Sequence, residues 1–426
     1  MSTHGPIVVV DPFSSGLHLA EAIAEVGHPC VGVRSLFDDR HALSPTTVQL
    51  FTEFIEHRDF GNTLARLRQL HPRAVIAGCE PAVELADALA GALGLRGNSS
   101  RRSEARRNKY LMQGALEESG FTGIQQIRTA DIDRAKNWAM FRNSWPVVAK
   151  PLESAGTDGV HICQNVKSLA AAFRNIVGRP NIYGAVNREV LVQEYLDGTE
   201  YVVDAVLRDG TMIVAAIWRY SKQQTSSGAP IYRYIEAIPL TGRLQNRLVE
   251  YARGVAEALE ISNGPVHVEI MWLVTRDEPV LVEMAARMHG GLGAVIPKLV
   301  YGTNQVELTI DAFTQGHRFA GDLSVPFVQQ GYLVEVFLVS GRQGRVRGYP
   351  VHELLPKLPS YVMHKLWLRG DRVEVTRDLW TSPGVVILQH ADREALARDI
   401  EAIARMESGN ELLVLDEALQ AEENSG

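Results

Sequence analysis

Residues 264–291 read GPVHVEIMWLVTRDEPVLVEMAARMHGG and contain the most informative structural pattern in the chain. Two runs rich in apolar and β-branched residues flank the turn-forming TRDEP, which is typical of an antiparallel hairpin. With the turn centred near Asp277, Glu269 pairs with Ala285 and Glu283 lies diagonally, two residues along. Because side chains alternate along a strand, the pattern predicts both carboxylates on one face.

Two acids on a mostly apolar hairpin repel each other strongly unless a cation lies between them. Mg²⁺ takes a few carboxylates plus phosphate oxygens, so Glu269 and Glu283 are predicted metal ligands for Mg²⁺, with Mn²⁺ as an alternative. Arg287, further along, places a planar cation beside the flexible His289-Gly290-Gly291 turn, where it could hold a phosphate or a carboxylate. The other interpretation is a solvent-exposed face with scattered charge.

A second group of residues lies upstream, in a predicted hairpin. WPVVAKP (145–151) is expected to form a buried strand, SAGTDG (154–159) a glycine-rich tip and VHIC (160–163) the returning strand. Backbone N–H groups of such a tip can fold over phosphate while Lys150 supplies charge. The pattern also fits a lysine with a purely structural role at a strand end.

The composition is that of an ordinary globular protein. The chain has 426 residues, of which 46% are hydrophobic, 22% charged and 7% aromatic, so two to four domains are expected. Lys plus Arg number 43 and Asp plus Glu 50, giving a net charge of −7. This charge argues against a protein whose main partner is nucleic acid or an anionic membrane.

Cysteine usage and hydropathy suggest the compartment. The chain has three widely spaced cysteines, Cys30, Cys79 and Cys163. This odd number and wide spacing argue against a disulfide framework and against a structural zinc site. They favour a reducing cytoplasm. No window of 18 apolar residues occurs, and the chain enters a strand-like run almost at once. We therefore expect a cytoplasmic protein that is neither exported nor membrane-spanning.

Strand and helix patterns alternate in the first hundred residues and then change character. Strands are expected at 7–10, 30–33 and 74–78, with helices from 17 and from 84, which predicts a parallel sheet. A basic helix is expected over 101–120. The later expectations are a helix at 167–177, a hairpin turning at Asp209-Gly210, a mobile loop within 221–234, a helix at 244–260, a β-rich region from 325 and a helix at 393–406.

Several common nucleotide-binding signatures are absent. No Gly-Lys dipeptide occurs, so the Walker-A phosphate loop is missing, and Gly16 stands alone after the first strand in place of G-x-G-x-x-G. The segment HRDFG (57–61) imitates two overlapped protein-kinase motifs that kinases carry separately. These observations argue against Walker-A enzymes and protein kinases and weaken the case for a dinucleotide-binding protein.

The order of Arg107-Asn108-Lys109, VVAKP, SAGTDGV, QEYLDGTEYVVD, GPVHVEI and VEMAARMHGG resembles the ATP-grasp superfamily, and within it the carboxylate–amine ligases that join amino acids, the L-amino acid ligases or dipeptide synthetases. The resemblance covers about residues 5–320. It implies a mixed α/β, or α+β, fold in four parts. These are an amino-terminal parallel α/β domain (1–100), a central lid subdomain (101–195), a catalytic domain (196–324) and a β-rich carboxyl-terminal extension (325–426).

The resemblance also implies roles for individual residues. Nucleotide binding falls to two lysines at the phosphates, a loop that closes over them, a hinge whose main chain reads adenine and an acid at the ribose hydroxyls. These residues are, in that order, Lys109 and Lys150; Ser154, Gly156, Thr157 and Gly159; Glu194, Tyr195 and Leu196; and Glu200.

The remaining implied roles concern metal and substrate. Glu269 and Glu283 match the magnesium ligands, but Ala285 stands where many members carry a ligating Asn, so water, phosphate or another side chain must complete the shell. Arg287 matches the arginine that steadies the acyl phosphate, and all three are expected to be catalytic. Substrate contacts are implied for His289, Gly290 and Gly291 on the carboxylate side and for Glu80 near the amine.

The implied reaction joins an amino acid carboxylate to the amine of a second amino acid, with ATP converted to ADP and phosphate through an acyl phosphate. Small-molecule amino acids are then the partners, and a homodimer is expected. Two alternatives remain open. One is an ATP-grasp ligase of purine or cofactor biosynthesis, and the other is a non-catalytic ATP-binding sensor.

Overall fold

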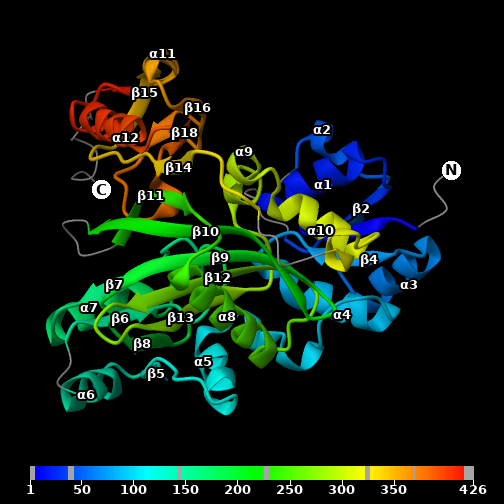
Figure 1. The fold of residues 1–426 in the computed structure, drawn as a ribbon. Coiled ribbons are helices and arrows are strands. Elements are labelled where there is room, and N and C mark those ends of the chain that lie inside the picture. Colours follow the sequence, from blue (N-terminus) through cyan, green and yellow to red (C-terminus); the bar gives the residue numbers. More distant parts are fainter. Residues whose placement is uncertain are drawn as a thin grey trace, which may run out of the picture. The chain divides into compact units, whose positions relative to one another are not determined.

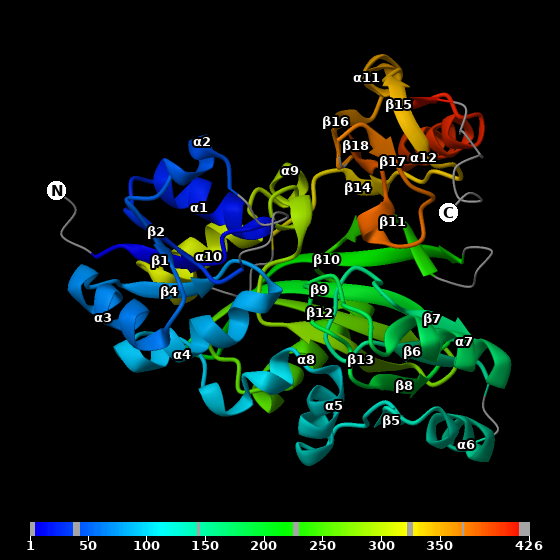
Figure 2. The same ribbon diagram turned by 180° about the vertical axis from the view of Figure 1, so that it is seen from behind.

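The structure, a computed structural model, describes residues 5–36, 43–142, 145–224, 230–321, 327–368 and 370–416. These residues form two compact units, each discontinuous in sequence. Figures 1 and 2 label the helices and strands from opposite sides. Unit 1 comprises the described residues of 1–125, 196–218 and 238–329, and unit 2 those of 126–195, 219–237 and 330–426. The four-part division expected from the sequence stays a prediction.

Unit 1 begins with a four-stranded sheet in the order β3-β2-β1-β4, whose pairs are all parallel, as the alternating pattern predicts. Odd residues of its first strand pack in one apolar cluster and even residues in another, so both faces of the sheet are buried. That burial explains the unbroken IVVV run. The elements are β1 (Ile7–Val10), α1 (Ser15–Glu25), β2 (Cys30–Arg34), α2 (Pro45–Val48), β3 (Glu53–Glu56), α3 (Phe60–Leu70), β4 (Ala74–Ala77) and α4 (Val83–Leu93).

The rest of unit 1 carries helices and long antiparallel strands in the order β13-β12-β9-β10. Strand β10 continues past Trp218 into unit 2, and Asp209 and Gly210 form the predicted turn with positive φ angles. The elements are α5 (Lys109–Glu118), β9 (Thr199–Arg208), β10 (Thr211–Gln224), α8 (Arg243–Ala258), β12 (Gly264–Leu273), β13 (Glu278–Ala285), α9 (Lys298–Tyr301) and α10 (Gln305–Phe313).

The helix expected over 101–120 is wrong in its first half. Two short 3₁₀ turns precede α5, and Asn108 caps that helix by accepting from the backbone N–H groups of Tyr110 and Leu111. The preceding Arg106 is fully buried and bonded to Asp87 and to two backbone carbonyls of the segment after α8. These contacts hold the segment as packed turns.

The predicted register of the hairpin is also wrong, although its topology is confirmed. Glu269 lies directly opposite Glu283, and a bulge after Glu269 shifts the pairing, so that Ile270 faces Leu281. Asp277, with φ 48, is the last residue of the turn and not its centre. The two carboxylates therefore share a face, as expected, but as a direct cross-strand pair with closer side chains than a diagonal one.

Unit 2 contains an antiparallel sheet, β5-β8-β6-β7, and a β-rich carboxyl-terminal part. The β6–β7 hairpin and the β-rich part are as predicted, whereas β5 was not predicted. Helices α6 and α7 pack against the first sheet through a shared apolar cluster (Figure 2). The first part has β5 (Gln126–Thr129), α6 (Ile132–Arg142), β6 (Val147–Lys150), β7 (His161–Cys163), α7 (Val166–Ile176) and β8 (Val190–Glu194). The second has β11 (Pro230–Ile238), β14 (Tyr332–Phe337), β15 (Gly344–Gly348), α11 (Val351–Leu354), β16 (Tyr361–Leu366), β17 (Arg372–Val373), β18 (Gly384–His390), α12 (Arg393–Ser408) and β19 (Val414–Leu415).

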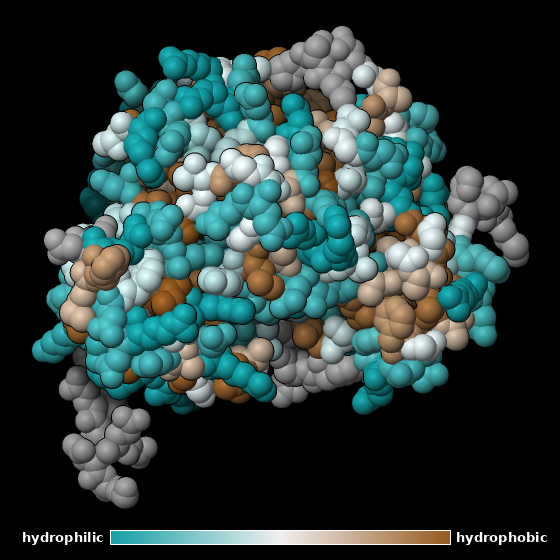
Figure 3. Space-filling view, turned by 90° about the horizontal axis from the view of Figure 1, so that it is seen from below, coloured by the Kyte–Doolittle hydropathy of each residue, from teal (hydrophilic) through white to brown (hydrophobic). Residues whose placement is uncertain are grey.

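The surface, the helices and the cysteines bear on the expectation of a protein without membrane spans or disulfides. The face drawn in Figure 3 is mostly hydrophilic, with hydrophobic residues in small groups. Within the described ranges, no helix has the length and apolar character needed to cross a bilayer. All three cysteines are free, which agrees with the expected lack of a disulfide.

Candidate active site

The carboxylate pair on the β12–β13 hairpin has a lysine beside it. Nζ of Lys109, the first residue of α5, lies 3.0 Å from Oε1 of Glu283, and their side chains are 8% and 14% exposed. Burial raises the pKa of Glu283, the charges of Glu269 and Glu80 raise it further, and the Lys109 ammonium offsets part of the rise. Three carboxylates thus lie near one another in a mostly buried place, and this all-oxygen donor set fits a hard divalent cation.

A buried ion pair lies beside this group. Nε of Arg287 donates to Oε2 of Glu80 at 2.9 Å, and its Nη1 donates to the carbonyl of Met288. Glu80 lies three residues beyond the carboxyl end of β4 and meets Arg287, although the two are far apart in sequence. The other oxygen of Glu80, Oε1, is buried and has no hydrogen-bond partner among the described residues. Such an atom calls for a donor that a ligand would supply.

The turn after β13 also meets the amino-terminal sheet. The backbone N–H of Gly291, at φ 60, donates to Oγ of Ser14, which follows β1. Ser14 lies in the segment VVVDPFSSG (8–16), and no pattern in that segment marked it as a site residue. The candidate site therefore lies where the carboxyl ends of β1 and β4 face the loop after β13, the usual place for ligands in open parallel sheets.

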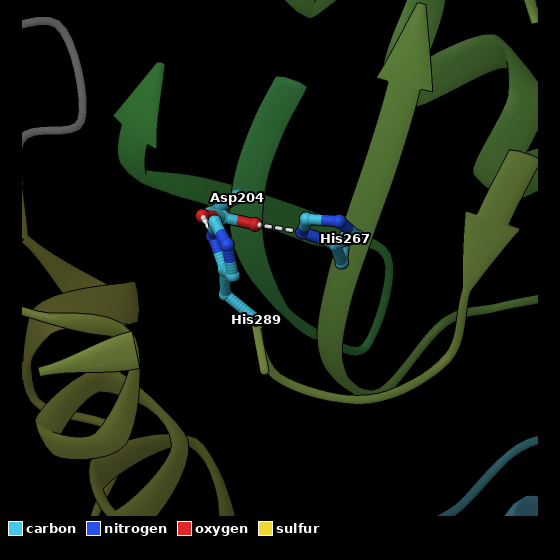
Figure 4. A group of neighbouring side chains, drawn as sticks. All are labelled: Asp204, His267 and His289. Carbon is cyan, nitrogen blue, oxygen red and sulfur yellow. Dashed lines mark hydrogen bonds and ion pairs between the residues drawn. The ribbon is translucent and has the colours of Figure 1, made fainter. Parts of the chain in front are cut away.

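Sequence reasoning missed a third feature, the buried Asp204 on β9 (Figure 4). Its Oδ1 lies 2.8 Å from Nδ1 of His267, and its Oδ2 lies 2.7 Å from Nδ1 of His289. Nε1 of Trp218 also donates to Oδ2, at 2.6 Å. The acid inside the otherwise apolar run VVDAVL (202–207) was the available signal, since a buried charge needs a partner.

The pKa values in this cluster diverge. Burial opposes charge on all three groups, but the two histidines lower the pKa of Asp204, while Asp204 and Glu269 raise the pKa of His267 to about 9. Burial lowers the pKa of His289, and the neighbouring His267 and Arg287 lower it further. At neutral pH, we therefore assign the positive charge to His267 and a neutral ring to His289.

Unit 2 carries the predicted phosphate loop. Lys150 ends β6 and is buried, and Gly156, Thr157 and Gly159 all have positive φ angles near 65°. Oγ of Ser154 donates to Asp158 at 2.6 Å, which shapes the loop from inside. The loop is also held from outside, because Leu379 N–H donates to the carbonyl of Gly156 and Trp380 Nε1 to that of Ala155.

The predicted adenine and ribose residues fall at a boundary in the chain. Unit 2 contains Glu194 and Tyr195, and unit 1 resumes at Leu196. Oε2 of Glu194 lies 3.6 Å from Nη2 of Arg142, and Glu200 is buried on β9 opposite Met271. Their nucleotide contacts stay predictions.

Known proteins resemble this chain in sequence and in fold. A model of the ATP-grasp domain matches residues 143–295. Dapdiamide A synthase of Enterobacter agglomerans is 33% identical over 410 residues, covering 94% of this chain and 96% of that protein. Alanine–anticapsin ligase of Bacillus subtilis strain 168 is 25% identical over 241 residues, covering 53% of this chain and 50% of that protein.

The solved structure of an L-amino acid ligase from Bacillus licheniformis shares the fold. It aligns with a TM-score of 0.76 at 17% identity and covers 98% of this chain and 100% of that one. The expected mixed α/β architecture, with its parallel amino-terminal sheet and β-rich end, is thereby confirmed as an ATP-grasp fold. The chain belongs to the ATP-grasp carboxylate–amine ligases, and within them it resembles the L-amino acid ligases.

Proposed function

We propose that this enzyme joins the carboxylate of one amino acid, or of an amino-acid-like acid, to the amine of a second amino acid. ATP phosphorylates the carboxylate, and the amine displaces phosphate from the acyl phosphate to give a dipeptide and ADP. The observation that carries the proposal is the cluster of Glu269, Glu283 and Lys109 beside the Arg287–Glu80 pair. Two opposed carboxylates that can bind a cation, next to a guanidinium group, can neutralise the charge that develops during phosphoryl and acyl transfer.

The charged residues have separable tasks. Glu269 and Glu283 would hold Mg²⁺, which supplies neutralisation of the phosphate charge when it is bound. Lys109 and Lys150 bind the phosphates, and the loop of residues 154–159 covers them and excludes water. Arg287 binds the acyl phosphate, and the paired Glu80 fixes the direction of its guanidinium.

Two observations favour amino acids as substrates. The names of the relatives describe one ligase that joins alanine to anticapsin and one L-amino acid ligase. The unpartnered Oε1 of Glu80 could accept a hydrogen bond from a substrate ammonium group. A ligase of purine or cofactor biosynthesis remains the second candidate within the family. The expected homodimer stays a prediction.

The products distinguish this mechanism from adenylation. With ATP, Mg²⁺ and pairs of amino acids, we expect ADP, phosphate and a product whose mass equals the two amino acids less one water. Product masses from a panel of pairs identify the substrates, and ATP turnover without ligation would indicate another acceptor. Release of AMP and pyrophosphate would contradict the acyl-phosphate route.

We expect nucleotide to protect the phosphate loop. Its glycine-rich tip lies next to a buried lysine, and closure would exclude water from a hydrolysable intermediate. Limited proteolysis should therefore cut within 154–159 less readily when a non-hydrolysable ATP analogue and Mg²⁺ are present. We expect the same of residues 221–230, of which 225–229 lie outside the described residues. The loop predicted within 221–234 is wrong at both of its ends, because 221–224 belong to β10 and 230–234 to β11. Unchanged cleavage at both segments would contradict closure.

A further inference from the structure

The Asp204 cluster consists of three buried polar side chains for which binding of ATP and metal gives no role. His267 pairs with Asp204 across β12 and β9, and His289 reaches the same carboxylate from the loop after β13 (Figure 4). The loop is held by Gln305, whose Oε1 accepts from the backbone N–H of His289 while its Nε2 donates to carbonyls on β9 and β12. His289 is therefore held at its ring by Asp204 and at its backbone by Gln305.

A metal ion held by the three side chains is the first alternative. Their possible ligand atoms lie within 4.8 Å of one another. However, the two nitrogen–oxygen distances are 2.7 and 2.8 Å, as in hydrogen bonds. Ligand atoms about 2 Å from one tetrahedral zinc would be about 3.3 Å apart. Hydrogen bonding explains the geometry better.

The hydrogen bonds determine the tautomer of His289. An ionised carboxylate only accepts, so Nδ1 of His289 carries the proton that Asp204 binds, and Nε2 keeps its lone pair. Among the described residues, this Nε2 takes part in no hydrogen bond. The ring packs closely over Gly293, where an added Cβ would lie 2.6 Å from its Cδ2, so only glycine fits beside it. His289 thus presents a fixed acceptor two residues from Arg287.

We infer that His289 is the base that takes the proton of the attacking amine, and that Asp204 is a positioning residue that holds its ring. The inference rests on the proposed function. The amine nitrogen forms a bond to the acyl carbon while the bond from carbon to the phosphate oxygen breaks. The electron pair of that bond leaves with phosphate, and Nε2 takes the proton that the nitrogen must lose.

Hydroxylamine separates this step from activation of the carboxylate. It traps acyl phosphates as hydroxamates, and its weakly basic nitrogen passes a proton readily to solvent. For His289→Asn, whose amide can still donate to Asp204, we expect amide formation to fall on the order of a hundredfold to ten-thousandfold. ATP-dependent hydroxamate formation should stay within about threefold of the wild type. Asp204→Asn, which can donate to Nδ1 and reverse the tautomer, should give the same split.

The control is His71→Asn, an exposed histidine with φ 48 at the end of α3, where asparagine is well tolerated. It should leave both rates unchanged. Three results would each overturn the inference. They are undiminished amide formation in His289→Asn, a parallel loss of hydroxamate formation in His289→Asn, and zinc that the purified wild type retains but the His289→Asn variant loses. No hydroxamate from the wild type would instead reject the acyl phosphate itself, and with it the proposed function.

Discussion

Glu269→Gln and Glu283→Gln are each expected to lower kcat by about a thousandfold or more, equivalent to about 4 kcal/mol of transition-state stabilisation. Each substitution removes one carboxylate of the opposed pair, and glutamine is a poor ligand for a hard divalent cation. Steady-state kinetics over a range of Mg²⁺ concentrations measure the loss, and Mn²⁺ titration followed by electron paramagnetic resonance measures binding directly.

The matched control is Glu278→Gln on the same hairpin. Its side chain is 38% exposed and pairs with Arg276 near the turn, so the change should leave kcat within about twofold. Thermal unfolding of all three variants should remain cooperative. A Glu269 or Glu283 variant with kcat and Mn²⁺ affinity near those of the wild type would show that the pair holds no catalytic cation.

Arg287→Lys should lower kcat by about a hundredfold and raise KM for ATP much less. Lysine keeps the charge but cannot reproduce the planar contact with two donors, and the interaction is needed most as the acyl phosphate forms and reacts. Steady-state kinetics give both constants. A rise confined to KM for ATP would assign Arg287 to nucleotide binding, and an unchanged kcat would contradict a catalytic role.

Arg287→Ala tests the same residue with a larger structural cost. Its partner Glu80 is 7% exposed, so the substitution leaves a buried carboxylate without its cation and should lower the free energy of unfolding by about 3–5 kcal/mol. Arg276→Ala, whose side chain is 54% exposed in the same hairpin, is the control and should alter neither stability nor kcat.

Patterns confined to one segment predicted much of the structure. The IVVV strand, the Asp209-Gly210 turn and the VVAKP hairpin follow from local periodicity and turn chemistry, and each is confirmed. Strand β3 was not predicted, because the short EFIE run is half-exposed at the sheet edge and lacks a clear apolar pattern. The bulge that pairs Glu269 with Glu283 extends one strand by a residue that the sequence does not mark.

The candidate site was harder to predict where it depends on distant segments. Lys109 was expected at the ATP phosphates, and the structure pairs it with Glu283, 174 residues away. The Arg287–Glu80 pair joins residues 207 positions apart. Asp204 went unnoticed because its histidine partners come from two other segments of the chain. Such contacts are set by tertiary packing, which periodicity does not encode.

A heavy oxygen isotope can be followed from the substrate carboxylate to the released phosphate. An amino acid labelled in both carboxylate oxygens is incubated with ATP, Mg²⁺ and its partner amino acid, and the released phosphate is analysed by mass spectrometry. An acyl phosphate requires one labelled oxygen in each phosphate formed, because the carbon–oxygen bond breaks when the amine attacks. Amide formation with unlabelled phosphate, or with the label in AMP, would contradict ligation through an acyl phosphate.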